Sequence, residues 1–156
     1  MSDEHFEAVW RRDRDGLRRA LTLSLGDAQL AGEAVDEAFT RAYARWSRVS
    51  QFDDPTAWLY RVATNWATSW LRKRRLRPVR PAEELETATV DAVADHTVLE
   101  AIEALPAAQR AVVVLRFYLD WEVPRIASAL DVPPGTVKSR LHRALSRLQD
   151  RKEIQR

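Results

Sequence analysis

The residues between Thr136 and Arg147 have side chains whose chemistry is easy to name. Four of them carry a positive charge, namely Lys138, Arg140, Arg143 and Arg147, and hydroxyl and imidazole groups lie between them. Ammonium and guanidinium groups bind phosphate, and a guanidinium can also pair with two acceptor atoms of one guanine. The pattern therefore predicts a surface that binds nucleic acid.

An amphipathic helix from Gly135 to Leu148 would hold these side chains on one face. Its apolar residues recur at steps of three and four and form one stripe that is expected to be buried, which consists of Val137, Leu141, Ala144, Leu145 and Leu148. A shorter helix is predicted from Pro124 to Leu130. It is followed by Pro133, which disfavours helix in the residue before it, and by Pro134, which suits a first helical turn. Two helices with a short turn between them, the second one basic, are typical of a helix-turn-helix that binds DNA.

A basic amphipathic helix can also be the solvated face of an ordinary helical bundle. That alternative accounts for the charges. It does not explain why they occur together with a turn before the helix and a proline in the first turn of the helix. DNA binding is therefore the favoured interpretation of residues 105–148.

A second basic run ends the helix that is predicted from Pro55 to Arg75. Asp54 and Pro55 are a typical N-cap and first-turn pair. The run from Arg72 to Arg75 has four consecutive positive charges, which exceeds what the end of a helix needs for its dipole. Together with Arg61, this run predicts another nucleic-acid surface.

The charge is distributed unevenly, although the whole chain of 156 residues has a net charge of only +2. The net charge is −3 over residues 1–60, +7 over residues 61–80, −7 over residues 81–105 and +5 over residues 106–156. Two basic blocks on either side of an acidic spacer indicate two separate phosphate-binding surfaces.

The rest of the pattern is helical, without the alternation that is typical of strands. Helices are predicted over residues 3–25, 30–46, 98–105 and 107–119, and a loop over residues 49–53. Gly26 is expected to end the first helix and Asp27 to cap the next. The aromatic residues expected on buried faces include Trp10, Tyr43, Trp58, Trp70, Phe117 and Tyr118. The chain is thus predicted to be all-α, with two small helical bundles (residues 1–77 and 98–156) joined by a flexible acidic linker (residues 78–97).

Several classes of protein are excluded by what the sequence lacks. There is no cysteine, and His5, His96 and His142 are too far apart for a zinc-hydrolase motif. No glycine-rich phosphate loop and no nucleophile paired with a base is visible, so we expect neither an enzyme nor a bound metal or cofactor. Acidic residues near the N-terminus exclude a signal peptide, and no apolar run is long enough for membrane insertion. We therefore expect a cytoplasmic protein.

Specific segments occur in a fixed order along the chain. The first half contains, in this order, Glu33–Phe39, Ala57–Asn65 and Trp70–Arg75. The second half contains Leu105–Pro106, Ile126–Ala127 and Gly135–Ala144. The first set resembles the conserved domain two of bacterial sigma factors, and the second set is similar to their domain four. With only a linker between them, the chain resembles the extracytoplasmic-function (ECF) type of the sigma-70 family over nearly its whole length.

This resemblance implies a dissociable initiation subunit of RNA polymerase. Its partners would be core RNA polymerase, promoter DNA and an anti-sigma factor. It implies that the −35 element is read by Pro134, Thr136, Lys138, Ser139, Arg140, His142 and Arg143. The −10 element would be bound and opened by Arg61, Asn65, Trp66, Ser69, Arg72, Lys73 and Arg75. A flipped base would be captured by Asn65 and the loop Val49–Asp53. Docking on the clamp helices of the largest polymerase subunit would use Glu33, Val35, Asp36, Glu37 and Phe39.

An ordinary repressor or activator with a C-terminal helix-turn-helix is the alternative from another functional class. It explains residues 105–148 but leaves the helix 55–75 and its basic tail without a role. It also predicts tight, specific binding to duplex DNA by the chain alone, whereas a sigma factor would bind weakly without core polymerase.

Overall fold

Two long helices, α1 (Ser2–Leu25) and α2 (Ala28–Ala44), pack along each other at the N-terminal end of the computed structural model, which describes residues 2–75 and 96–154. Gly26 ends α1 with a φ of 72°, a conformation that glycine adopts without strain. The Asp27 carboxylate then accepts a hydrogen bond from the Leu30 N–H at 3.0 Å. Both predictions for this turn are confirmed.

The predicted helix 30–46 begins earlier and ends earlier than expected. After α2 ends at Ala44, the short helix α3 (Trp46–Val49) carries Trp46 into the core with 4% of its surface exposed. Val49 therefore belongs to a helix and is buried, so the predicted loop is shorter by this residue.

Helix α4 (Pro55–Arg75) has the predicted bounds. The Asp54 carboxylate accepts a hydrogen bond from the Ala57 N–H at 3.1 Å, which confirms the predicted N-cap. The helix packs against α1 and α2, and its fully buried side chains include Leu59 and Tyr60. Since α4 carries the basic tail, this packing determines where that tail lies.

The C-terminal part of the chain is also helical. Its elements are α5 (His96–Glu103), α6 (Ala107–Val113), the π-helix η1 (Val114–Tyr118), α7 (Val123–Leu130) and α8 (Pro134–Ile154). The predicted helix 107–119 thus changes from α to π geometry half-way, where the Leu119 N–H bonds to the Val114 carbonyl at 3.2 Å. The predicted linker 78–97 lies outside the described residues except for His96 and Thr97, which are in α5.

Five residues predicted to be buried are exposed. The exposed fractions are 39% for Trp10, 56% for Tyr43, 58% for Phe117, 42% for Tyr118 and 46% for Leu145. Helical spacing predicts which residues share a face, but not how far a neighbouring helix extends over that face. The neighbouring helices leave these five side chains uncovered.

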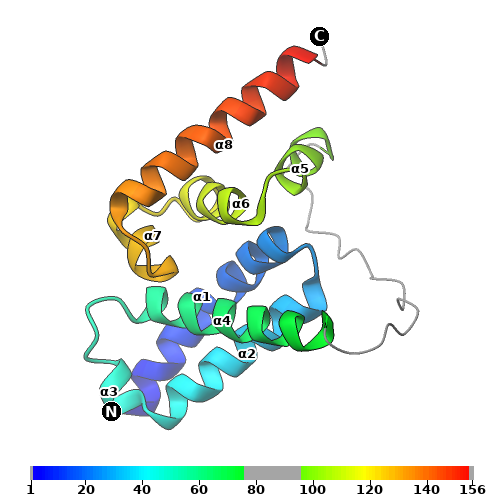
Figure 1. The fold of residues 1–156 in the computed structure, drawn as a ribbon. Helices are drawn as coiled ribbons and strands as arrows, with labels where there is room; N and C mark the ends of the chain where they lie inside the picture. Colours follow the sequence, from blue (N-terminus) through cyan, green and yellow to red (C-terminus); the bar gives the residue numbers. More distant parts are fainter. Residues whose placement is uncertain (1, 76–95, 155–156) are drawn as a thin grey trace.

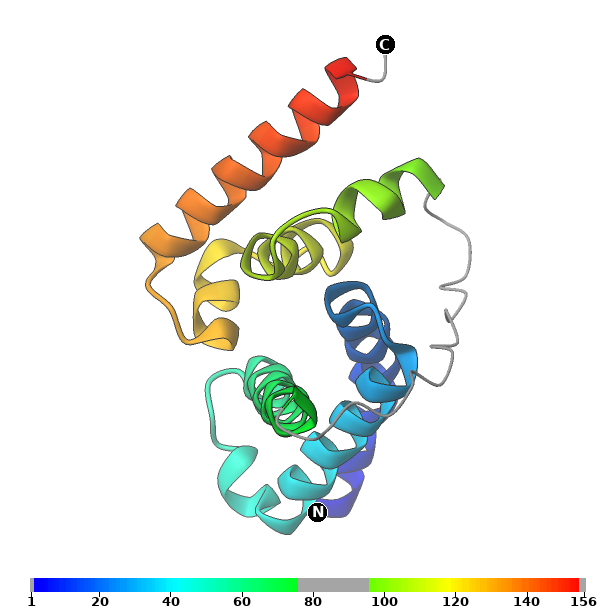
Figure 2. The same ribbon diagram turned by 45° about the vertical axis from the view of Figure 1, so that its right-hand side comes forward.

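The two parts of the chain are in contact. The N-terminal unit (residues 2–75) and the C-terminal unit (residues 96–154) share one hydrophobic cluster, in which Tyr60 and Leu21 belong to the first unit and Leu115 and Ile126 to the second. Figures 1 and 2 show α7 beside the beginning of α4, while α8 extends away from the N-terminal unit. Within the described residues, no helix is long and apolar enough to cross a membrane.

Candidate nucleic-acid and polymerase interfaces

The residues predicted to read the −35 element share the first half of α8. Pro134, Lys138, Ser139, His142 and Arg143 are exposed, and Thr136 and Arg140 are half-buried. The opposite face is fixed by Val137 and Ala144, both 0% exposed. The helix is therefore held on one side by α6 and α7 and presents its basic side to solvent.

The turn before α8 is built by residues that tolerate unusual backbone angles. Asp131 adopts the left-handed conformation with a φ of 55°, which aspartate tolerates better than most residues. The Val132 N–H bonds back to the Ala127 carbonyl at 3.1 Å, and the Thr136 N–H bonds to the Pro133 carbonyl at 3.0 Å. These bonds satisfy backbone groups at the end of α7 and the start of α8, and they set the angle of the helix-turn-helix.

The basic end of α4 forms a second charged surface. Arg72, Lys73, Arg74 and Arg75 are all exposed in its last turn, and the Arg74 guanidinium lies 5.3 Å from the centre of the Trp70 ring. Among the other residues predicted for the −10 element, Asn65 and Ser69 are exposed and Trp66 is half-buried against the core. An exposed surface with amide, hydroxyl, indole and guanidinium groups can contact both the bases and the backbone of a single strand.

Arg61 is placed differently from the rest of this set. Its Nη2 donates a hydrogen bond to the Ser128 carbonyl on α7 and lies 3.9 Å from the Asp131 carboxylate. The structure therefore separates Arg61 from the free basic end of α4 and joins it to the helix-turn-helix.

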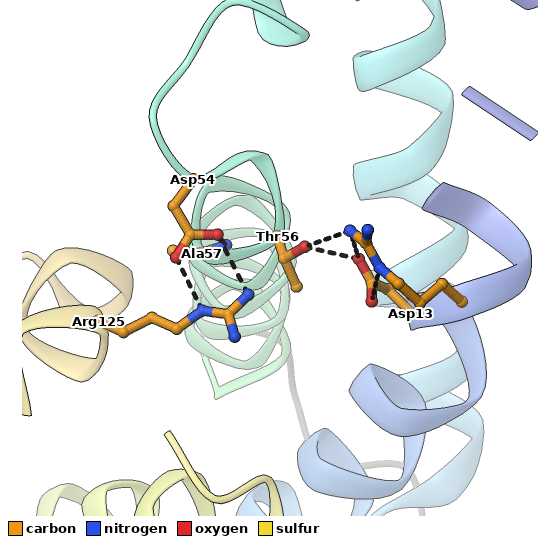
Figure 3. A network of polar contacts seen from close by, with 6 residues as sticks. Asp13, Asp54, Thr56, Ala57 and Arg125 are labelled. Carbon is orange, nitrogen blue, oxygen red and sulfur yellow. Dashed lines mark hydrogen bonds and ion pairs between the residues drawn. The ribbon is translucent and has the colours of Figure 1, made fainter. Parts of the chain in front are cut away.

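The beginning of α4 is held from two sides by a polar network (Figure 3). On one side, the buried Thr56 hydroxyl donates to the Asp13 carboxylate of α1 at 2.5 Å. A hydrogen bond to the same carboxylate raises the pKa of the Arg12 guanidinium. On the other side, Arg125 of α7 donates to both Asp54 oxygens, at 2.7 and 3.2 Å.

The loop predicted to help capture a flipped base leads directly into α4. Gln51 and Asp53 are exposed, and the half-buried Phe52 packs on Trp58 with ring centres 5.9 Å apart. Asn65 lies ten residues beyond Pro55 on α4, about 15 Å along the helix axis at 1.5 Å per residue. A pocket shared by the loop and Asn65 would have to bridge this length.

The residues predicted for polymerase docking divide into surface and core. Glu33 and Asp36 are exposed, and Glu37 is half-buried and pairs with Arg41 at 3.0 Å. Val35 and Phe39 are only 2% and 4% exposed, because their side chains pack into the core and orient α2, and their contact with a partner stays a prediction.

Sequence reasoning missed an aromatic groove beside these acidic residues. The groove has a volume of about 340 Å³ and is lined by Phe6, Trp10, Asp36, Phe39, Thr40 and Tyr43. Its two exposed aromatic residues are Trp10 and Tyr43, which were expected to be buried. The signal in the sequence was the number of large aromatic residues on the facing sides of α1 and α2, more than a small core can enclose.

In the described ranges, no group of three or more histidine, aspartate or glutamate side chains is placed to hold a metal ion.

Comparison with known proteins matches both halves of the chain to one family. Residues 9–77 match the model of sigma-70 region 2, and residues 95–148 match that of sigma-70 region 4. The chain is 37% identical over 153 residues to the RNA polymerase sigma-E factor of Streptomyces antibioticus, covering 95% of this chain and 84% of that relative. It is 33% identical over 156 residues to the ECF RNA polymerase sigma factor SigL of Mycobacterium tuberculosis, covering 94% and 84%.

A solved structure has the same fold. It is the co-crystal structure of the sigma factor RpoE in complex with the anti-sigma factor NepR from Bartonella quintana, which superposes with a TM-score of 0.77. The match covers 98% of this chain and 99% of that chain, at 21% sequence identity.

Proposed function

The chain belongs to the extracytoplasmic-function group of the sigma-70 family, whose members direct promoter-specific transcription initiation, and on this premise we propose how its residues divide that work. The observation that carries the proposal is the presence of two exposed basic surfaces on two different helices, the end of α4 and the start of α8. Each surface is supported by its own apolar packing. Two separate DNA elements can therefore be bound by one chain.

Helix α8 reads the −35 element as duplex DNA. Its first turns carry the side chains of a recognition helix, and such residues reach base edges in the major groove. Arg140 and Arg143 are suited to guanine or phosphate, while Thr136, Ser139 and His142 offer short donors and acceptors.

Helix α4 binds the −10 element as it opens. Arg72, Lys73 and Arg75 supply the charge for the backbone, and Trp66 and Asn65 lie further back on the same helix. Stacking on an aromatic ring and hydrogen bonds to an unstacked base favour the opened strand over the duplex. Arg61 joins this surface when it is released from Ser128.

The acidic side of α2 and the aromatic groove dock on core polymerase. Glu33, Asp36 and Glu37 supply charge, and the exposed rings of Trp10 and Tyr43 supply apolar area. Tryptophan and tyrosine are enriched at the centres of protein interfaces, because a large ring buries much area at a small entropic cost.

The chain acts in the cytoplasm and performs no catalytic step of its own, because the chemistry of RNA synthesis belongs to the polymerase. An anti-sigma factor is a further partner. The Bartonella quintana RpoE was crystallised with such a factor, NepR, and its fold matches this chain as a whole.

The test is in vitro transcription with core polymerase and a pool of genomic promoter fragments. Arg140→Glu is expected to lower transcription from −35-dependent promoters by about 10- to 100-fold. The substitution removes one contact with a base or phosphate, and the new carboxylate is repelled by the phosphates of the DNA. The control is Lys152→Glu, a charge reversal near the far end of the same helix. Both variants should bind core polymerase as the unaltered chain does.

Two outcomes would contradict the proposal. Loss of core binding in the Arg140 variant would mean that the two halves are assigned to the wrong tasks. Selection of a specific duplex by the chain alone, with the first eighty residues dispensable, would favour an ordinary repressor or activator instead.

A further inference from the structure

Lysine is rare in this chain, and two of its three lysines lie on the proposed DNA-binding surfaces. Of the 25 lysine and arginine residues, 22 are arginine, and the lysines are Lys73, Lys138 and Lys152. Lys73 lies in the basic end of α4, and Lys138 lies in the second turn of α8. An arginine keeps its charge throughout the physiological pH range, whereas a lysine amine can be converted into a neutral amide. Acylation can therefore remove charge from these surfaces only at their lysines.

Lys138 is exposed and has no acidic neighbour along its helix. No aspartate or glutamate occurs on α8 between Pro134 and Gln149. Residues three or four apart on a helix are neighbours, so an acid at such a position could hold the ammonium group in an ion pair. On its own helix, the side chain of Lys138 is thus free to meet a reagent from solution.

The residue one turn after Lys138 is His142, which is also exposed. Side chains of an α-helix lean toward its N-terminus, so the imidazole of His142 leans toward the side chain of Lys138. An imidazole is the most frequent general base in proteins, because it accepts a proton near neutral pH. No histidine lies three or four residues from Lys73 or Lys152. Lys138 is therefore the one lysine of the sequence with a base at helical spacing.

The surface around Lys138 attracts small anions. Arg140, Arg143 and Arg147 follow it on α8, so residues 134–149 carry four positive charges and no negative charge. Such a surface raises the local concentration of a dianion, most strongly at low ionic strength. An acyl phosphate is an anion that carries an activated acyl group. The charges that bind DNA phosphate therefore also bring this class of reagent to the amine.

We propose that Lys138 is an acetylation site, at which an acyl phosphate switches off the reading of the −35 element, and that His142 is the base. The free amine attacks the acyl carbon of acetyl phosphate, an N–C bond forms, and the C–O bond to the phosphoryl group breaks. Inorganic phosphate leaves, and the proton lost by the nitrogen passes to His142 and then to water. The amide that results has no charge and no longer binds phosphate as an ammonium group does. This inference rests on the proposed function, because it supposes that α8 binds promoter DNA.

The first experiment measures the acetylation of each lysine in the full chain by acetyl phosphate, using mass spectrometry of peptides. It uses a Lys73→Arg chain, in which Lys138 and Lys152 are the only lysines. Lys152 is the matched control, because it is an exposed lysine near the far end of the same helix. Lys138 should react about tenfold faster than Lys152, since a loosely held base contributes less than a fixed one. His142→Gln should remove most of this difference.

Two results of this experiment would overturn the proposal. One is an equal rate of acetylation at Lys138 and Lys152. The other is a rate at Lys138 that His142→Gln leaves unchanged. The rate at Lys152 should be the same with and without His142→Gln, which shows that the substitution does not disturb the helix as a whole.

The second experiment measures transcription with untreated core polymerase, after the acetylated chain has been separated from the reagent. Acetylation of Lys138 should lower transcription from −35-dependent promoters about three- to tenfold, the effect of one lost phosphate contact. Lys138→Gln imitates the amide and should give a similar loss, whereas Lys152→Gln should give none. Unchanged transcription by a chain that is acetylated at Lys138 would overturn the proposed switch. A chain that gives no promoter-specific transcripts before any treatment would instead overturn the proposed function, whatever the acetylation rates are.

Discussion

Helices α4 and α8 each have 21 residues and each carry a basic surface, but they are anchored in very different ways. Helix α4 buries Thr56, Ala57, Leu59, Tyr60, Ala63 and Ala67 and contacts α1, α2 and α7. Among the side chains of α8 that the structure describes, only Val137 and Ala144 are buried, and its second half extends away from the N-terminal unit (Figure 1). One helix is part of the core, and the other rests on the core along a narrow seam.

The difference has a consequence for both stability and function. A helix buried on a wide face can be held rigidly while its exposed end opens DNA, because many contacts resist its displacement. A helix held along a narrow seam keeps most of its circumference free to enter a groove. Substitutions on the buried face of α4 should therefore change folding and function together, and substitutions at exposed positions of α8 should change function with little effect on folding.

The largest expected effect tests this comparison with the same substitution in both helices. Leu59→Ala on α4, where the side chain is 0% exposed, should lower the free energy of unfolding by about 3 kcal/mol because it leaves a cavity in the core. Leu145→Ala on α8, where the side chain is 46% exposed, should lower it by less than about 0.5 kcal/mol. Urea denaturation measures both values, and similar losses in the two variants would disprove the proposed difference in anchoring.

The basic end of α4 should act on DNA without acting on folding. Replacement of Arg72, Lys73 and Arg75 by alanine should reduce the salt dependence of promoter binding by the polymerase complex by about two units of slope, since each contact with a single-strand phosphate contributes about 0.7. Between 50 and 200 mM salt, the loss of promoter affinity should therefore be about 16-fold smaller for the variant complex than for the unaltered one. An unchanged slope would mean that these side chains do not contact phosphates in the complex.

The local signals in the sequence predicted α4 well, and the long-range contacts could not be predicted. Asp54 and Pro55 encode the start of the helix in adjacent residues, so both the bounds and the cap were predicted correctly. The partner of the same Asp54 is Arg125, 71 residues away, and no periodicity connects the two. The exposed groove residues Trp10 and Tyr43 were missed for the same reason, because burial depends on neighbours that helical spacing does not specify.

Asp54 and Asp27 allow the two tasks of an N-cap residue to be separated. Asp27→Ala removes only the cap of α2 and should cost about 1 kcal/mol of unfolding free energy. Asp54→Ala removes the cap of α4 and the partner of Arg125, so it should cost more, about 1.5 kcal/mol. Asp54→Asn keeps a good capping side chain and should recover most of this loss. A loss with asparagine as large as that with alanine would show that the ion pair, and not the cap, stabilises this end of α4.

The smallest expected effects concern one glycine from each region. Gly26 has a φ of 72° in the turn between α1 and α2, so Gly26→Ala should cost about 1 kcal/mol, because a side chain with a Cβ is strained there. Gly135 is in the first turn of α8, and an added Cβ would meet nothing within 4 Å. Gly135→Ala should therefore stabilise the chain by about 0.5 kcal/mol, mainly because alanine restricts the unfolded chain. Thermal unfolding of the two variants compares them directly. An added methyl group should not destabilise a helical position that has free space around it. If Gly135→Ala lowered the stability, the start of α8 would therefore be packed as tightly as α4.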